Sequence, residues 1–222
     1  MNERVAIFID GSNLYHSLKN NFGRSNINFT EFTARLCGPR WLMRTYYYNI
    51  LQDQFQWPTG YLEQQEFIDV LRKTPYFEVK LGTTKVAQGQ PVERGIDIML
   101  ATDMLNLAWK NAYDVAVLVS GDSDFAYAMQ SIKNMGKQVE IAYFENAVSK
   151  DLVELADKKH IFDAVFFNGL WAGQSNNSSN KPKRKFSRWT ARGNSEQKKP
   201  VTKDCLSSGE SHASCESNTA SG

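Results

Sequence analysis

The stretch VAVLVSGDSDF, residues 115–125, joins an unbroken apolar run to two carboxylates. A short apolar run of this kind, closed by a Ser-Gly turn signal, is typical of a strand that is buried on both faces. Asp122 and Asp124 would then follow the carboxyl end of that strand. The stretch VAIFIDGSN, residues 5–13, repeats the pattern and places Asp10 after another apolar run. The sequence therefore predicts carboxylates at the edge of a buried sheet.

The rest of the first 171 residues alternates between strand-like and helix-like patterns. We predict strands at residues 5–9, 45–51, 76–81, 115–119, 139–143 and 161–167, and helices at residues 14–20, 29–36, 60–71, 95–109, 125–135 and 148–156. Residues 83–93 (TTKVAQGQPVE) are interpreted as a polar loop. Alternation of this kind predicts an α/β fold with a central, mostly parallel sheet of five or six strands covered by helices on both faces.

Beyond residue 171 the alternation stops, and the chain becomes rich in Ser, Asn, Lys and Arg. Such a composition cannot bury enough apolar surface to offset its ordering entropy. We therefore predict one domain at residues 1–171 and a disordered basic tail at residues 172–222. From residue 174 onward there are nine Lys/Arg and four Asp/Glu, against 17 and 20 before it. A basic tail on a mildly acidic body indicates a polyanionic partner.

The composition also excludes several classes of protein. No run of 18 apolar residues occurs, so we expect no membrane span. The apolar run before Asp10 is too short for the core of a signal peptide. The three cysteines, Cys37, Cys205 and Cys215, form no CxxC pair. This sparse usage favours a reducing, cytoplasmic setting and argues against a structural zinc site.

The acidic residues predict a metal site. Ligands of open α/β sheets bind beyond the carboxyl ends of the strands, where the strand order reverses. Asp10 and Asp122 would converge there if their strands are neighbours, and Asp97, at the start of a helix, could reach the same cleft. Two carboxylates about 4 Å apart repel by roughly 4 kcal/mol at an effective dielectric of 20. Protonation or a cation must relieve that repulsion. Oxygen ligands favour Mg²⁺ or Mn²⁺, which can promote phosphodiester hydrolysis.

Each acid also has a simpler interpretation. Asp124 precedes a helix, so it could be an N-cap as readily as a ligand. Asp10 lies in DGSN, where Asp-Gly is turn chemistry. Asp97 and Asp103 are about 120° apart around a helix, so both cannot point into one site. We expect Asp97 to be the ligand, and Asp103 to be a buried acid behind it or a sign of helix distortion.

The sequence contains no complete motif for a phosphatase, a nucleotide-binding loop or a histidine metal site. The sequence FIDGSN lacks the first Asp of a haloacid-dehalogenase loop, because Phe8 occupies that position, and no Gly-rich nucleotide loop occurs. His16 and His160 lack metal-ligand spacing, and we expect them on a helix surface and at a helix end. The TYYYN segment at residues 45–49 is interpreted as strand packing, with its tyrosines alternating between the two faces.

Three segments in order, FIDGSNLY, GIDIMLATDML and LVSGDSDFAYAMQSIKNMGKQVEIA, resemble the NYN domain. More narrowly, they resemble the LabA (DUF88) group of PIN-like proteins, over about residues 3–170. The resemblance implies a PIN-like three-layer sandwich and a metal-dependent nuclease acting on RNA. The family's acidic site would fall on Asp10, Asp97, Asp122 and Asp124, and its polar helpers on Asn13 and Ser120.

Basic residues complete the expected substrate contacts. Many NYN relatives carry Lys before the Gly-hydrophobic-Asp motif, and Arg94 stands at that position here, where it could hold a phosphate or be a surface residue. The tail segment KPKRKFSRWTAR, residues 181–192, combines six basic residues with Phe186 and Trp189. Basic charge attracts phosphates and aromatic rings stack on bases, so the segment could bind RNA or serve as a solvated tail. Its centre is Lys183, Arg184 and Lys185.

Two functional hypotheses result. In the first, the protein is a ribonuclease in which Asp10, Asp97 and Asp122 hold Mg²⁺ or Mn²⁺ directly or through water, and Asp124 completes the site or orients the water. In the second, it is a non-catalytic module that binds RNA or a regulatory protein. Both place it in the cytoplasm without a membrane contact and leave open a homo-oligomer.

Overall fold

The computed structural model describes residues 3–87 and 90–173, with the backbone alone described at residues 83–87 and 90–94. All described residues belong to one compact unit. Residues 174–222 of the predicted tail, Lys183, Arg184 and Lys185 among them, lie outside the described residues. The domain boundary and the disorder of the tail therefore stay predictions.

The centre of the described fold is a seven-stranded sheet in the order β4-β3-β2-β1-β5-β6-β7. The strands are β1 (Arg4–Asp10), β2 (Trp41–Ile50), β3 (Phe77–Ala87), β4 (Gln90–Arg94), β5 (Val115–Val119), β6 (Gln138–Tyr143) and β7 (Lys158–Ile161). Strands β3, β2, β1, β5, β6 and β7 are parallel, and β4 pairs antiparallel with β3 at the edge. The predicted parallel sheet of five or six strands is confirmed.

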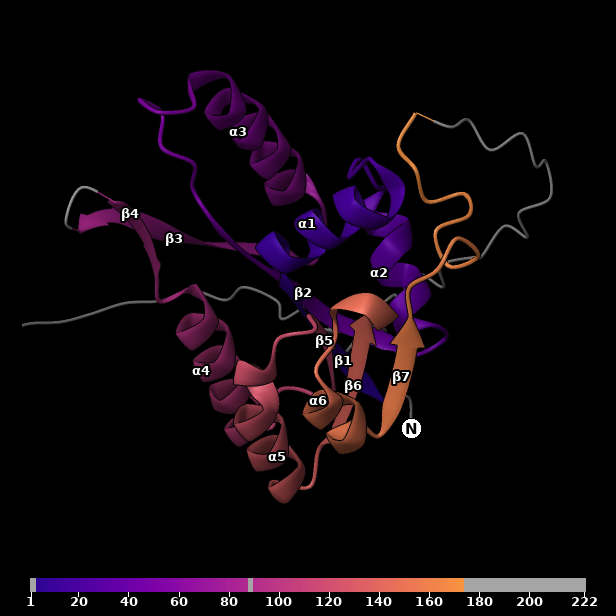
Figure 1. Cartoon of the computed structure of the whole chain (residues 1–222). Coiled ribbons are helices and arrows are strands. Elements are labelled where there is room, and N and C mark those ends of the chain that lie inside the picture. The colour runs from indigo at the N-terminus through magenta and orange to yellow at the C-terminus, as the bar shows by residue number, and fades with distance from the viewer. Residues whose placement is uncertain (1–2, 88–89, 174–222) are drawn as a thin grey trace, which may run out of the picture. The chain divides into compact units, whose positions relative to one another are not determined.

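Helices cover both faces of this sheet (Figure 1). They are α1 (Gly11–Phe22), α2 (Phe29–Cys37), α3 (Pro58–Lys73), α4 (Ile96–Trp109), α5 (Ala126–Asn134) and α6 (Lys150–Leu155). Leu14 of α1, Phe32 of α2 and Leu71 of α3 belong to one apolar cluster. Met104 of α4 and Met129 of α5 belong to another. The two clusters are separated by the sheet, which confirms the three-layer α/β sandwich.

The apolar runs that predicted buried strands are buried. All five residues of β5 are inaccessible, and in β1 only Arg4 is partly exposed. In β2, Tyr46 and Tyr48 pack into the α4–α5 cluster, whereas Tyr47 packs into the α1–α2 cluster. The interpretation of TYYYN as strand packing with alternating faces is confirmed. The sheet is therefore a rigid base for the side chains at its carboxyl edge.

Two predicted elements were wrong. Residues 83–93 are not a loop, because β3 continues to Ala87 and pairs with β4 in a hairpin. Pro91 lies on the edge strand β4, where its missing N–H is tolerated. The last strand is Lys158–Ile161 and not residues 161–167. Phe162 and Phe167 are buried, but they fill the core from turns, so their apolar character marked packing and not a strand.

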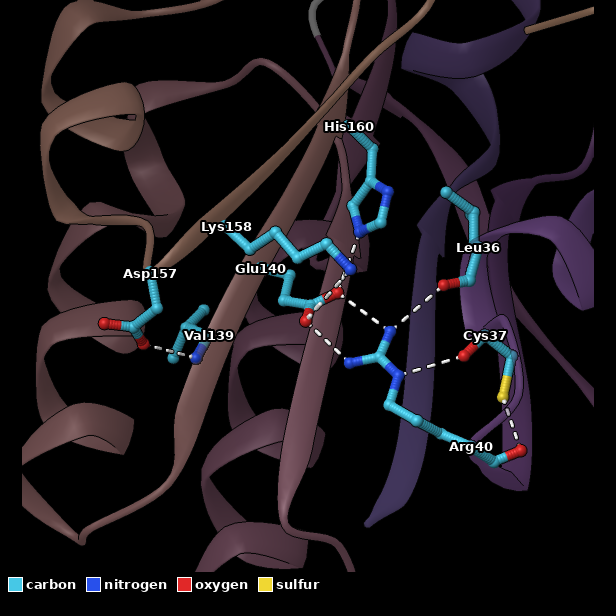
Figure 2. A network of polar contacts seen from close by, with 8 residues as sticks. All are labelled: Leu36, Cys37, Arg40, Val139, Glu140, Asp157, Lys158 and His160. Atoms are coloured by element: carbon cyan, nitrogen blue, oxygen red, sulfur yellow. Dashed lines mark hydrogen bonds and ion pairs between the residues drawn. The ribbon is translucent and has the colours of Figure 1, made fainter. Parts of the chain in front are cut away.

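An ion pair with little exposure to solvent joins the C-terminal end of α2 to the sheet (Figure 2). The Arg40 guanidinium donates to both carboxylate oxygens of Glu140 in β6, at 2.6 and 3.0 Å. It also donates to the carbonyl oxygens of Leu36 and Cys37 at the end of α2. His160 Nε2 lies 2.8 Å from Glu140 Oε2. His160 was expected at a helix end, but it lies in β7. His16 is exposed on α1, as expected.

Candidate active site

The carboxyl edge of the sheet has a switch point between β1 and β5. These strands are parallel neighbours in register from Val5↔Val115 to Ile9↔Val119. From β1 the chain adds β2 and β3 on one side, and from β5 it adds β6 and β7 on the other. Asp10 and Ser120 directly follow this register. The strands that carry the two acidic motifs are thus neighbours, which is the condition on which the sequence argument for a shared site depended.

Asp10 ends β1 and is the N-cap of α1. Its Oδ1 accepts a hydrogen bond from the Asn13 backbone N–H at 3.0 Å, and its Oδ2 accepts one from Ser120 Oγ at 3.1 Å. The side chain is 8% exposed. Asp10 therefore caps α1 itself, a role that the turn interpretation did not assign to it. This cap is compatible with a role in the site because a carboxylate has further lone pairs to offer.

Ser120 and Gly121 fix the position of Asp122. The Asp122 N–H donates to Ser120 Oγ at 3.2 Å, so this buried hydroxyl bridges Asp10 and the Asp122 backbone. A side chain at Gly121 would overlap the backbone carbonyl of Ala147, and the Gly121 carbonyl accepts from the Ser149 N–H at 3.0 Å. The loop after β5 is therefore held between β1 and the segment before α6.

Two other carboxylates at this edge act on Asp10. Burial raises the pKa of Asp10 to about 6, against hydrogen bonds from Asn13 and Ser120 that lower it. The negative charges of Asp97 and Asp122 raise the pKa of Asp10 further. Asp97 lies in the first turn of α4. Asp10 therefore senses the charges of Asp97 and Asp122, which come from two other elements, and the assignment of the three acids to one metal site stays a prediction.

The fourth expected acid is placed differently. The Asp124 backbone N–H donates to Asp122 Oδ1 at 3.0 Å, so Asp122, and not Asp124, caps the short 3₁₀ helix at Ser123–Phe125. The Asp124 residue is exposed. The described contact between Asp124 and Asp122 is thus made by the Asp124 backbone N–H and not by its carboxylate.

Asp103 is engaged away from the other acids. Its Oδ2 accepts from the Tyr48 hydroxyl and from Lys80 Nζ, both at 2.9 Å. Both partners come from strands on the β2–β3 side of β1. Asp103 therefore ties α4 to the sheet, and the choice of Asp97 as the ligand stays a prediction.

The remaining predicted residues have less defined places. Asn13 contributes its backbone N–H to Asp10, and its side chain is half-buried. Arg94 ends β4 opposite Thr83, but its side chain lies outside what the structure describes.

Sequence reasoning missed a polar group beside the site. Ser12 Oγ donates to Asn49 Oδ1 at 3.1 Å, and Asn49 Nδ2 donates to the Tyr47 hydroxyl at 3.1 Å. Asn49 lies near the carboxyl end of β2, the other neighbour of β1. The sequence signal that could have identified Asn49 was its position directly after the aromatic run of β2.

The donor chemistry can be tested against a divalent cation. Within the residues whose side chains are described, no group of three or more His, Cys, Asp or Glu is close enough to hold a metal ion directly. Mg²⁺ commonly keeps several waters and takes only one or two carboxylates from the protein. Oxygen donors at Asp10, Asp97 and Asp122 fit that mode of binding, and they do not form a closed protein cage.

Comparisons with known proteins agree with the fold. The NYN domain family model matches residues 4–164. The chain is similar to a protein of unknown function from Vibrio parahaemolyticus, with a TM-score of 0.62 and 22% identity over 73% of this chain and 94% of that one. At this identity the likeness shows the fold alone.

Two further matches add less, one because it is short and the other because its fold likeness is weak. An uncharacterized protein, y4oD, from Sinorhizobium fredii is 36% identical over 53 residues, which are 24% of this chain and 25% of the relative. This match therefore spans a quarter of the relative's length. A nicotinic acid mononucleotide adenylyltransferase from Plasmodium falciparum has a TM-score of 0.34 at 8% identity, over 72% of this chain and 74% of that one. That score supports no conclusion.

Proposed function

The chain belongs to the NYN domain family, and from this membership and the site geometry we propose that it is a metal-dependent ribonuclease that hydrolyses phosphodiester bonds in RNA. NYN domains share the fold of the PIN-like nuclease superfamily. The observation that carries the proposal is the pair of Asp10 and Asp122, joined through Ser120 at the switch point of the sheet.

Asp10, Asp97 and Asp122 are the groups that would hold Mg²⁺ or Mn²⁺. When bound, the cation supplies an activated water and stabilises negative charge on the phosphate. Ser120 and the first turn of α1 orient the Asp10 carboxylate. The Asp124 carboxylate, exposed beside Asp122, would orient the attacking water. Asn13 would position phosphate oxygens from the first turn of α1.

RNA is the proposed partner. Arg94, which precedes the Gly-Ile-Asp motif, would contact a phosphate, and the tail residues Lys183, Arg184 and Lys185 would add affinity that depends on salt. Among the helices of residues 3–87 and 90–173, none has the length and apolar character needed to cross a bilayer. A cytoplasmic site of action is proposed from the sparse cysteines of the sequence.

A second candidate is an RNA-binding module that does not cleave. One observation favours it: among the described side chains, no three His, Cys, Asp or Glu residues lie close enough together to hold a metal ion. In this case the acidic edge would be neutral to RNA binding, and the basic residues would supply the affinity. A regulatory protein partner or a second copy of the chain would then carry the biological effect.

A cleavage assay separates the two candidates. Labelled single-stranded RNA would be incubated with wild type, Asp122→Asn and the control Asp69→Asn, in Mg²⁺, Mn²⁺ or EDTA. Asp69 is a matched aspartate in an exposed pair with Arg72 on α3. The ribonuclease proposal expects metal-dependent cleavage by wild type and Asp69→Asn only. Cleavage that persists in Asp122→Asn, or inert proteins that bind RNA equally, would contradict it.

A further inference from the structure

A groove of about 880 Å³ lies beside the acidic site, between α1, α2 and α3. Gly11 and Ser12, the residues that directly follow Asp10, belong to its lining. Asp10 itself caps α1, so the groove begins at the residues next to the acidic site. Its volume falls within the ~300–1,000 Å³ of small-molecule pockets.

The chemistry of the lining is aromatic and amide-rich. Phe29, Tyr47 and Phe67 form a mutually packed set of rings with centroids 5.4 to 5.6 Å apart. Ser12 and Asn49 add a hydroxyl and an amide that are already linked to the Tyr47 hydroxyl. A planar group with polar edges can pack on the aromatic rings with its face and form hydrogen bonds to the hydroxyl and amide groups with its edges.

The charge of the lining decides between a phosphate and a base. Glu63 is the one residue with a formal charge among the described residues that line the groove, and none of them is Lys or Arg. A phosphodiester backbone would be repelled by Glu63 and would find no cation. An uncharged planar nucleobase meets neither difficulty.

Tyr15 provides a stacking surface at the rim of the groove. Its side chain is 45% exposed on α1, one turn after Ser12. Lys19 Nζ lies 5.8 Å from the centroid of this ring. The rim thus combines an aromatic ring with a nearby cation, a pairing suited to a base and its adjoining phosphate.

We propose that this groove binds one unpaired base of the RNA substrate next to the phosphate held at the acidic site. The inference rests on the proposed function for its substrate class and adds a base-binding subsite to it. Tyr15 would stack on the base, while Phe29, Tyr47 and Phe67 would form the apolar floor.

The test measures RNA binding in EDTA, where no metal-dependent cleavage occurs. Fluorescence anisotropy would follow a short labelled single-stranded RNA and a series of copies that each lack one base. The proteins are wild type, Tyr15→Ala, Tyr15→Phe and the control Tyr127→Ala. Tyr127 is a matched tyrosine, 84% exposed on α5 and outside the groove. Because Tyr15 is exposed, its substitution should leave the core intact.

One abasic position should weaken binding to wild type by roughly five- to 150-fold, the range expected for loss of one stacked base. Tyr15→Ala should bind the intact RNA more weakly and lose most of that abasic penalty, while Tyr15→Phe and Tyr127→Ala keep it. Equal binding of all abasic copies, or an unchanged penalty in Tyr15→Ala, would overturn the subsite even if wild type cleaves RNA. Absence of any RNA binding by wild type would overturn both the subsite and the proposed substrate class.

Discussion

At the scale of single residues, the site depends on small groups that position the acids. Ser120 touches both Asp10 and the Asp122 backbone, and Gly121 lets the loop pass under the Ala147 carbonyl. Neither residue carries charge. Their positions in SGD made them predictable as neighbours of the site, but the bridge from Ser120 to Asp10 spans 110 residues of sequence and required the strand order.

Gly121→Ala tests whether the loop after β5 is held by close packing. The added methyl would overlap the backbone of Ala147, so we expect a loss of about 1–3 kcal/mol in unfolding free energy, as for overpacking elsewhere. RNA cleavage should fall as well, because Asp122 would shift. Urea unfolding followed by circular dichroism measures the stability.

Gly60→Ala is the matched control for this prediction. A methyl at Gly60 in α3 would meet only the end of the Gln52 side chain, which can move away. Helix propensity favours Ala over Gly by roughly 0.5–1 kcal/mol. Equal stability of the two variants would refute the close-packing account of Gly121.

At the scale of elements, apolar periodicity predicted the central strands and the helices well, but it did not predict the strands at the edges of the sheet. The fully buried β5 was predicted with its observed bounds because its whole length is apolar. The edge strand β7 (KKHI) is largely exposed and carries no apolar pattern. The pair of Arg40 and Glu140 joins residues 100 positions apart, so local sequence contained no signal for it.

Glu140→Gln tests the contribution of the network in Figure 2. The substitution leaves the Arg40 guanidinium without its carboxylate, and both side chains are largely buried, at 14% and 4% exposure. We expect a loss of about 3–5 kcal/mol in unfolding free energy, as when one side of a buried pair is removed. The control Glu78→Gln breaks the exposed pair with Arg44 and should cost at most about 1 kcal/mol. Similar losses in both variants would count against the role of the buried pair.

The same network predicts a dependence of stability on pH. Burial would raise the pKa of Glu140, but hydrogen bonds from His160 and Arg40 outweigh it and lower the pKa to about 2. Because an unfolded Glu titrates near about 4.3, the stabilisation is fully present above that pH and is lost as the pH falls toward 2. Urea unfolding of wild type between pH 6 and 3 should show this loss, and Glu140→Gln should show a shallower decline. Parallel curves would contradict the assignment to Glu140.

At the scale of the whole molecule, the sequence separates an acidic body from a basic tail. Deletion of residues 174–222 should weaken RNA binding and reduce its dependence on salt, because each phosphate contact contributes a slope of about −0.7 for single strands. If the protein is the non-catalytic binding module, Asp122→Asn in the full chain should bind RNA like wild type. Anisotropy across a salt series measures both. An unchanged affinity and slope after the deletion would remove the tail from the RNA-binding surface.

The central claim is that Asp10, Asp97 and Asp122 form one site for a divalent cation. The most direct measurement is Mn²⁺ binding, followed by electron paramagnetic resonance of the free ion, because it does not depend on the choice of RNA. We expect wild type and Asp69→Asn to bind Mn²⁺ alike and Asp10→Asn and Asp97→Asn to bind it much more weakly. Equal binding by all four proteins, or no binding by wild type, would contradict the account.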